Sequence, residues 1–194
     1  LAAEETTRQF DKKLVIERSD LRSKTSGLPR CHTMKPDISW SCSNIDKLIS
    51  KYNLSDYILL FPFCSEHLEQ KKWPYYDQLI KMIKQNHPNL KIVIAPGPSE
   101  IEKAKKFDAV SILKEDKAIS ISELAGLIKK SRFVVSNDTG PAHMAAHMNV
   151  KGLSLFGSHT TAYKVSIERE NFKVIQVSDL KNLSAEKVFE RLVF

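Results

Sequence analysis

The sequence contains little cysteine and no long apolar run. Its three cysteines, Cys31, Cys42 and Cys64, are odd in number and include no Cys-x-x-Cys pair. A disulfide framework is therefore not predicted, and a zinc site at Cys31, His32 and Cys42 lacks the usual ligand spacing. Reduced thiols are typical of cytosolic proteins. No stretch approaches the ~20 apolar residues of a membrane span, and no signal peptide begins the chain. We therefore expect a soluble, cytoplasmic protein without a metal.

Glycine is also scarce, and the six glycines form neither of the two common phosphate-binding signatures. The pattern Gly-x-Gly-x-x-Gly after a strand is missing, and so is the pattern Gly-x-x-x-x-Gly-Lys-Ser/Thr. We therefore predict neither a dinucleotide-binding Rossmann site nor a P-loop.

Positive charge is in excess, with a formal net charge of +7. Such a charge suits acidic partners, including phosphates, anionic lipid head groups and nucleic acid. Most of the 30 basic residues are lysines spread along the chain, which argues against nucleic-acid binding. We expect no nucleic-acid partner, whereas a solvated basic surface and peripheral membrane contact both stay open.

The length of 194 residues, with 42% hydrophobic and 27% charged residues, is that of one large folded domain. The first fifty residues differ from the rest, because they are polar and are interrupted by Gly27-Leu28-Pro29 and Lys35-Pro36-Asp37. We interpret residues 1–50 as a connector or as the remnant of a missing amino-terminal domain. Residues 51–194 are predicted to form the folded domain.

Apolar runs of strand length alternate with amphipathic helical patterns along this domain. The predicted strands lie at residues 57–61, 91–95, 109–113, 133–136, 152–156 and 173–177. Strands that are apolar on both faces and alternate with helices indicate an α/β fold, a doubly wound parallel sheet flanked by helices. Ligands of such sheets bind beyond the carboxyl ends of the strands. We therefore expect the site in the loops at 62–74, 96–100, 114–120, 137–141 and 157–162.

The central stretch RFVVSNDTGPAHMAAH, residues 132–147, predicts a buried strand, a polar turn and a helix. Pro141 suits the first helical position, and Gly140 allows a tight bend before it. Such a turn leaves N–H groups at the positive end of the helix, which suits an anion. Three side chains could contact that ligand: Asp138, Thr139 and His143. We expect a phosphate-bearing ligand; a helix that is merely well capped is the alternative.

Polar side chains at two other strand ends complete the candidate site. Ser65 and Lys71 lie in the loop after the first strand, and Lys71 offers a point charge for phosphate. Glu100 follows the second strand and could hold a ribose diol. On the residues alone, Lys71 could equally be a surface lysine, and Glu100 an acid favoured by a helix N-terminus. Ser99 with Glu102 forms a capping-box pattern for that helix.

The triplet Asp138-Thr139-Gly140 after two valines is also the active-site sequence of aspartic proteases, in which paired carboxylates share a proton. Those proteins are all-β, and their triplet is not followed by Pro and a helix rich in Ala and Met. Because this chain alternates strands and helices, we do not expect a protease.

Three motifs together resemble glycosyltransferase family 9, the lipopolysaccharide heptosyltransferases. FVVSNDTGPAHMAAHMNVKGLSLFGSHT resembles the signature region of the family, PFCSEHLEQKKWP its loop ending in Lys-x-Trp-Pro, and SISELAGLIKKSRF the helix before the signature strand. The three occur in the same order and spacing across residues 57–160. The resemblance covers the carboxyl-terminal, nucleotide-sugar-binding half of a two-domain GT-B fold, whose Rossmann-like architecture agrees with the predicted sheet.

The resemblance implies an enzyme that transfers a sugar from an ADP-activated heptose, with inversion, to a hydroxyl of the lipopolysaccharide core. The expected partners are the nucleotide-sugar and a lipid-linked oligosaccharide acceptor, and no metal or other cofactor is expected. Such an enzyme would work in the cytoplasm, with peripheral contact at the cytoplasmic face of the inner membrane. Lys71 and the turn at Thr139-Gly140 would hold the diphosphate and stabilise it as the leaving group. The other expected donor contacts are Asp138 and His143 at the sugar-diphosphate, Glu100 at the ribose, Ile119 at the adenine, and Ser65.

The family's general base is not expected in this chain. In the family an amino-terminal domain supplies the acceptor site and the carboxylate that must reach the acceptor hydroxyl. Asp11 and Asp20 lack the surrounding Gly-rich pattern, so neither is assigned that role. We expect either a fragment of a longer enzyme or a truncated product that binds the donor. Two alternatives remain, a non-catalytic nucleotide-binding module and another GT-B-like sugar transferase or epimerase that uses UDP.

Overall fold

The structure of the chain, a computed structural model, describes residues 38–193. Asp11, Asp20, Cys31 and His32 lie outside this range, as does most of the predicted connector at residues 1–50. The connector and the domain boundary after residue 50 therefore stay predictions.

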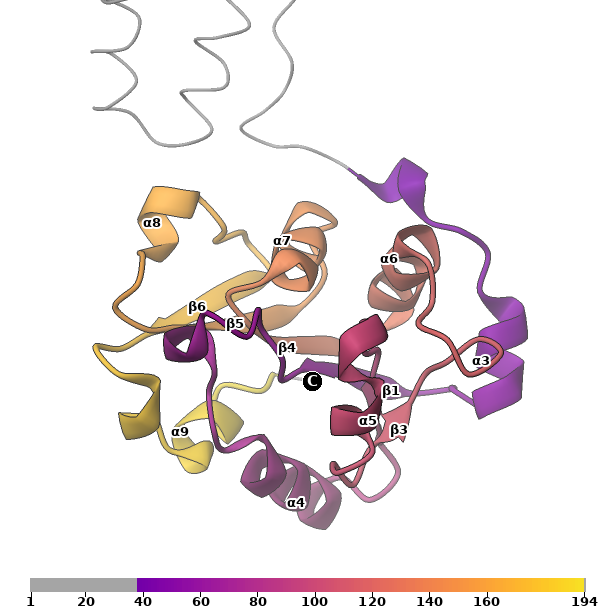
Figure 1. Ribbon diagram of the computed structural model, residues 1–194, viewed down its shortest axis with the longest axis horizontal. Helices are drawn as coiled ribbons and strands as arrows, with labels where there is room; N and C mark the ends of the chain where they lie inside the picture. Colours follow the sequence, from indigo (N-terminus) through magenta and orange to yellow (C-terminus); the bar gives the residue numbers. More distant parts are fainter. Residues whose placement is uncertain (1–37, 194) are drawn as a thin grey trace, which may run out of the picture.

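Six parallel strands form one sheet in the order β3-β2-β1-β4-β5-β6 (Figure 1). The strands are β1 (Tyr57–Phe61), β2 (Lys91–Ile94), β3 (Val110–Ser111), β4 (Phe133–Asn137), β5 (Gly152–Phe156) and β6 (Phe172–Gln176). The order reverses between β1 and β4, as in doubly wound nucleotide-binding folds. The predicted fold class is confirmed.

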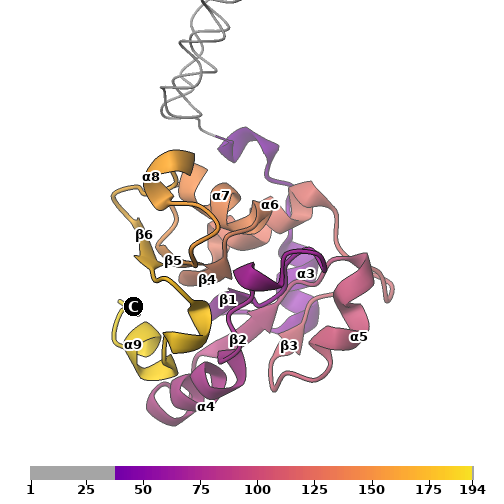
Figure 2. The same ribbon diagram turned by 60° about the vertical axis from the view of Figure 1, so that its left-hand side comes forward.

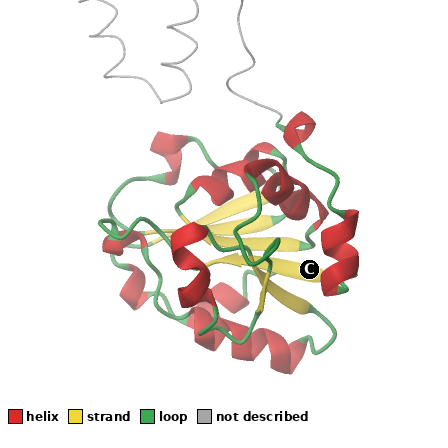
Figure 3. Cartoon of the chain, turned by 45° about the vertical axis from the view of Figure 1, so that its right-hand side comes forward, coloured by secondary structure: helices red, strands yellow, loops and turns green. Residues whose placement is uncertain are grey.

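Helices cover both faces of this sheet (Figures 2 and 3). The α-helices are α3 (Asp46–Tyr52), α4 (Tyr76–Asn86), α5 (Ile101–Ala104), α6 (Ile121–Lys130), α7 (Gly140–His147), α8 (Ala162–Val165) and α9 (Ala185–Phe189). Short 3-10 turns lie at η1 (Ser39–Ser41), η2 (Glu69–Lys71), η3 (Pro98–Glu100) and η4 (Leu180–Asn182). Buried side chains from α3, α6 and α7 join one core cluster, and those from α4 and α9 join the other.

Strand β1 shows why a continuous apolar run is required at the centre of the sheet. Tyr57, Leu59 and Phe61 pack in the cluster beneath α6 and α7, while Ile58 and Leu60 pack in the cluster beneath α4 and α9. Successive side chains of a strand point to opposite faces, so a strand covered on both faces needs apolar residues throughout. All five residues are buried.

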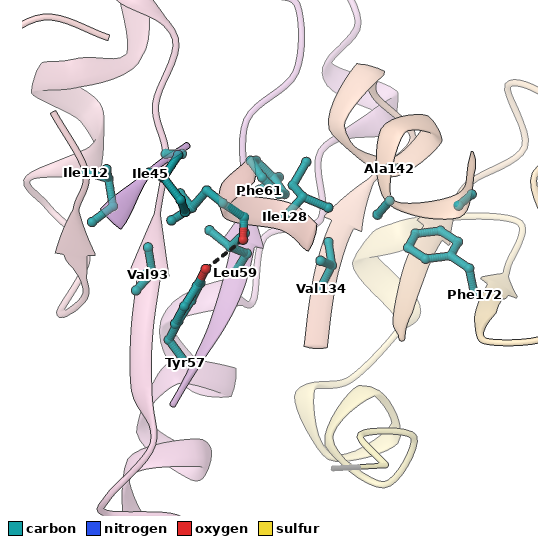
Figure 4. Packing of buried hydrophobic residues seen from close by; sticks show 14 of the residues in the cluster. Ile45, Tyr57, Leu59, Phe61, Val93, Ile112, Ile128, Val134, Ala142 and Phe172 are labelled. Atoms are coloured by element: carbon teal, nitrogen blue, oxygen red, sulfur yellow. Dashed lines mark hydrogen bonds between the residues drawn. The ribbon is translucent and has the colours of Figure 1, made fainter. Parts of the chain in front are cut away.

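The cluster on the α6 and α7 side includes one polar atom that is paired within the core. The Tyr57 hydroxyl donates to the carbonyl of Leu127 in α6 at 2.7 Å (Figure 4). Burial raises the pKa of Tyr57 well above its usual value, so this hydroxyl stays a donor at neutral pH.

Helix α3 extends this core towards the amino terminus. Ile45, immediately before it, and Leu48 within it are buried. Gly126 in α6 permits the approach, because a Cβ at this position would lie 2.6 Å from the Ser43 carbonyl oxygen.

Candidate functional site

A cavity of about 510 Å³ opens at the carboxyl edge of the sheet, beside the ends of β1, β2 and β4. Four predicted site residues line it: Ser65, Glu100, Ile119 and Thr139. Most of the remaining wall is apolar and includes Phe61, Phe63, Ala95, Pro96, Ala118 and Leu124. An apolar hollow with a few polar groups is the usual form of a small-molecule site.

The loop after β1 is fixed against the end of β4 by Asn137, which is fully buried. Its Oδ1 accepts hydrogen bonds from the Trp73 backbone N–H at 3.2 Å and the Tyr76 hydroxyl at 3.3 Å. Its Nδ2 donates to the Pro62 carbonyl at 3.0 Å. These bonds join both ends of the loop to β4, and thereby determine where Lys71 lies.

Beside the cavity, Asp138 is surrounded by three basic side chains, which together we call the Asp138 cluster. Lys71 Nζ lies 2.8 Å from Asp138 Oδ2, and His159 Nε2 lies 2.9 Å from the same oxygen. His143 Nε2 lies 3.5 Å from Oδ1. The cluster joins the loops after β1, β4 and β5, and Thr139, the residue after Asp138, lines the cavity.

The electrostatics of the cluster favour an ionised carboxylate with the cationic group outermost. Burial alone would raise the pKa of Asp138, but hydrogen bonds from His143, Lys71 and His159 hold this pKa well below its usual range. The Asp138 side chain is 5% exposed, whereas that of Lys71 is 22% exposed. Lys71, rather than the carboxylate, therefore presents its charge to solvent.

His159 is a member of this cluster that the sequence analysis did not single out. It lies in the loop after β5. Its side chain is 7% exposed, and its ring stacks on that of Phe156 with centroids 5.8 Å apart. The one available signal was its position after a predicted strand, within the loop at 157–162. Contact with Asp138 depends on how neighbouring loops pack, which a single sequence does not reveal.

The start of α7 offers fewer N–H groups than the sequence suggested. Thr139 is the N-cap, and its carbonyl accepts from the N–H groups of Ala142 at 3.0 Å and His143 at 3.4 Å. Pro141 has no N–H. Among the first four helical residues, only Gly140 N–H is left to face an anion. Gly140 itself is exposed, and a Cβ at this position would meet no atom within 4 Å.

Glu100 faces the cavity but also has a structural partner. Its Oε2 accepts a hydrogen bond from the Gly97 N–H at 2.8 Å, so the predicted capping box of Ser99 with Glu102 is wrong. Only the Glu100 half of such a box forms, two residues earlier, because the helical turn begins at Pro98 and its N-cap, Gly97, has no side chain. One oxygen of Glu100 is therefore engaged within the loop.

Residues 3–192 match the model of glycosyltransferase family 9 (heptosyltransferase). The chain belongs to this family. The resemblance indicated by the three motifs is thereby confirmed, and the match extends well beyond them at both ends.

Individual heptosyltransferases resemble the chain over part of their length. Lipopolysaccharide heptosyltransferase 1 of Campylobacter coli is 29% identical over 100 residues, which are 47% of this chain and 29% of that protein. The E. coli heptosyltransferase WaaC, solved with ADP, has a TM-score of 0.66 at 22% identity and matches 89% of this chain. The E. coli ADP-heptose lps heptosyltransferase II has a TM-score of 0.63 at 18% identity and matches 84% of this chain.

The structural matches establish only the fold of this family-9 chain, because sequence identities of 22% and 18% are too low to show more. They cover 53% of WaaC and 51% of heptosyltransferase II, so the chain spans about half the length of these proteins. The UDP-GlcNAc 2-epimerase of Methanocaldococcus jannaschii shares the same architecture with a TM-score of 0.51 at 16% identity, over 76% of this chain and 42% of that protein.

In residues 38–193 of this family-9 chain, the predicted site residues gather at one edge. Lys71, Asp138 and His143 meet in the cluster, and Gly140 stands in the sequence between Thr139 and Pro141, which line the cavity. Their individual roles stay predictions. Within the same residues, no group of three or more His, Cys, Asp or Glu side chains is arranged to hold a metal ion. No helix there is long and apolar enough to span a bilayer.

A pH-dependent stability is expected from His147, one turn beyond His143 in α7. Burial, then the charges of Arg169 and His143, lower the pKa of His147 to about 4 from a usual 6.5. His147 therefore binds a proton more readily in the unfolded chain than in the folded one. Its contribution to the free energy of unfolding is fully present above pH ~6.5 and is lost as the pH falls towards ~4. We expect wild type to lose about 2 kcal/mol more than His147→Gln between pH 7.5 and 4.5, measured by urea denaturation.

The control for this prediction is His67→Gln, because His67 is exposed in the loop after β1. This variant should follow the wild-type pH dependence. If wild type and His147→Gln lose stability in parallel, His147 is not the group responsible.

Proposed function

We propose that this chain is the donor-binding part of a heptosyltransferase-like glycosyltransferase, which binds an ADP-activated heptose for inverting transfer to a lipopolysaccharide core hydroxyl. One observation carries the proposal: an apolar cavity and a lysine-bearing charged cluster lie next to each other at the carboxyl edge of a doubly wound sheet. The cavity suits a nucleoside and the cluster suits its diphosphate. WaaC, which shares the fold, was solved with ADP and with ADP-2-deoxy-2-fluoro heptose.

The diphosphate would be bound at the start of α7. Lys71 Nζ has donors to spare beside the one facing Asp138, because an ammonium group has three. Gly140, which is exposed, carries a backbone N–H at the positive end of the helix. Together they supply fixed donors for the charge that develops on the diphosphate as the sugar leaves, which is electrostatic stabilisation of the transition state.

The nucleoside would occupy the cavity. Ile119 offers an apolar surface to the adenine, and Glu100 keeps one oxygen, Oε1, beyond its bond to Gly97 for the ribose diol. Ser65 lines the same cavity from the loop after β1. No metal enters this scheme, because lysine and backbone donors take the place of a cation at the phosphates.

The chain would then be divided into a donor domain and a connector, and the acceptor would be bound by a further domain. Residues 51–194 would be the donor domain, on whose core Ile45 and Leu48 also pack. Residues 1–50 would form the connector towards an acceptor-binding domain, which would supply the general base. The acceptor would be a lipid-linked oligosaccharide at the cytoplasmic face of the membrane, where a net charge of +7 favours peripheral contact with anionic head groups.

The test is calorimetric titration of the chain with ADP and with UDP. We expect ADP to bind more tightly, and Lys71→Ala to weaken ADP about tenfold to hundredfold, as for the loss of a charged hydrogen bond. The substitution also leaves the Asp138 carboxylate without its lysine partner, so this carboxylate would repel the phosphates.

The matched control is Lys72→Ala, the neighbouring lysine, whose side chain is 50% exposed and lies 3.9 Å from Glu69. It removes the same charge from the same loop and should change ADP affinity less than twofold, on the order of a surface ion pair. Equal losses in the two variants would contradict the assigned role of Lys71. A preference for UDP would favour the epimerase-like alternative, which the shared architecture with UDP-GlcNAc 2-epimerase supports.

A further inference from the structure

The side chain of His159 is almost buried although one of its two ring nitrogens has no hydrogen-bond partner among the described residues. Its side chain is 7% exposed, yet Nδ1 is buried without a hydrogen-bond partner among the described residues. A buried polar atom without a partner costs stability. Within residues 38–193, the one polar contact of the ring is Nε2 to Asp138 Oδ2 at 2.9 Å. The ring is thus placed for that single contact, with the Phe156 ring stacked on it at 19°.

That contact determines what Asp138 can do. Oδ2 faces both Lys71 Nζ at 2.8 Å and His159 Nε2 at 2.9 Å, and a carboxylate oxygen has two lone-pair sites. Its acceptor capacity is therefore filled by these two groups. Rotation of the carboxylate would break both bonds at once.

The consequence reaches Lys71, which has a flexible four-carbon stem. Lys71 Nζ is held in place because it contacts the Asp138 carboxylate, and His159 in turn holds this carboxylate. Without His159, the carboxylate has one fewer donor and is freer to turn. Lys71 Nζ then loses its fixed position, which weakens its attraction for a phosphate.

We infer that His159 is a positioning residue of the phosphate site: its Nε2–H fixes Asp138, which in turn fixes Lys71. The inference rests on the proposed function, because it takes the nucleoside diphosphate as the ligand of Lys71. His159 itself does not contact the ligand.

The experiment is calorimetric titration of the 194-residue chain with ADP, comparing His159→Leu and His159→Gln with wild type. Leu keeps an apolar side chain beside Phe156 but removes the donor. We expect a fivefold to tenfold weaker affinity, about the worth of one ordinary hydrogen bond, which is less than for Lys71→Ala because His159 acts on the ligand only through Lys71. Gln can place an N–H near the position of Nε2 and should stay within about threefold of wild type. His67→Leu, on an exposed histidine, is the matched control and should bind as wild type does.

A double-mutant cycle separates positioning from general structural support. In a Lys71→Ala background, His159→Leu should change ADP affinity less than about twofold, because the residue through which it acts is gone. Thermal unfolding of each variant reports whether the domain remains folded.

The outcomes distinguish this inference from the proposed function. If ADP binds wild type and His159→Leu equally well, or if His159→Leu weakens ADP by the same factor with and without Lys71, the positioning role is overturned while the proposed function stands. If wild type does not bind ADP, the proposed function and the positioning role fall together.

Discussion

Trp73→Ala should lower the free energy of unfolding by about 4 kcal/mol, the largest effect we expect from a single substitution in this chain. The indole is 1% exposed and packs edge-on against Tyr76 and Tyr75, with ring centroids 4.9 and 6.0 Å away. Its Nε1–H donates to the Leu183 carbonyl at 2.7 Å. Truncation would leave a cavity and an unpaired carbonyl in the core between α4 and α9. Urea denaturation at pH 7 measures the loss.

Two further variants test the explanation. Trp40 is 85% exposed in η1, so Trp40→Ala makes the same chemical change at the surface and should cost less than about 0.5 kcal/mol. Trp73→Phe keeps most of the ring but removes the indole N–H, and should cost about 1–2 kcal/mol through the unpaired carbonyl. If Trp73→Ala and Trp40→Ala cost the same, the loop after β1 is not anchored in the core as the structure indicates.

Trp73 also connects stability with the site, because the loop that it anchors carries Lys71. The tryptophan is fixed through its side chain to Leu183 and through its backbone to Asn137. Lys71 lies two residues earlier, in η2. Lys71, on a surface loop, is thus held in place because Trp73, two residues further along the chain, is buried.

The fold could be predicted because burial on both faces leaves a strong trace in the sequence. The run Tyr57–Phe61 is apolar throughout, and the structure shows alternate residues of β1 in separate core clusters. The third strand was predicted at residues 109–113, whereas β3 spans only Val110–Ser111. It is an edge strand, paired to β2 alone, and its two residues are half-buried. Its hydrophobic pattern therefore carries less information about its ends.

The site could be predicted in part. Lys71 and Asp138 meet, as expected for residues at carboxyl ends of neighbouring parallel strands. The same reasoning could not find His159, because any of several polar residues in the loop after β5 could have faced Asp138. It also missed Asn137, which looks like an ordinary turn residue in sequence. Its importance follows from hydrogen bonds to Trp73, Tyr76 and Pro62, which precede it in the sequence by 64, 61 and 75 residues.

Asn137→Asp should cost about 3 kcal/mol or more at pH 7, although the two side chains have nearly the same shape. Asn137 is fully buried, and its Nδ2 donates to the Pro62 carbonyl at 3.0 Å. The substitution replaces this donor with an oxygen, so two acceptors would face each other. It also places a carboxylate next to Asp138, without a cation of its own, in a site from which water is excluded.

The pH dependence of this variant identifies the cause. Burial would raise the pKa of the introduced carboxyl in the folded state above its unfolded value of about 3.9. The folded variant therefore binds a proton more readily, and its deficit relative to wild type should shrink as the pH falls through the raised pKa. Asn182→Asp, on an exposed residue, is the matched control and should cost less than about 0.5 kcal/mol at any pH tested. A deficit in Asn137→Asp that stays constant between pH 7 and pH 5 would mean that the lost hydrogen bond alone, rather than a buried charge, is responsible.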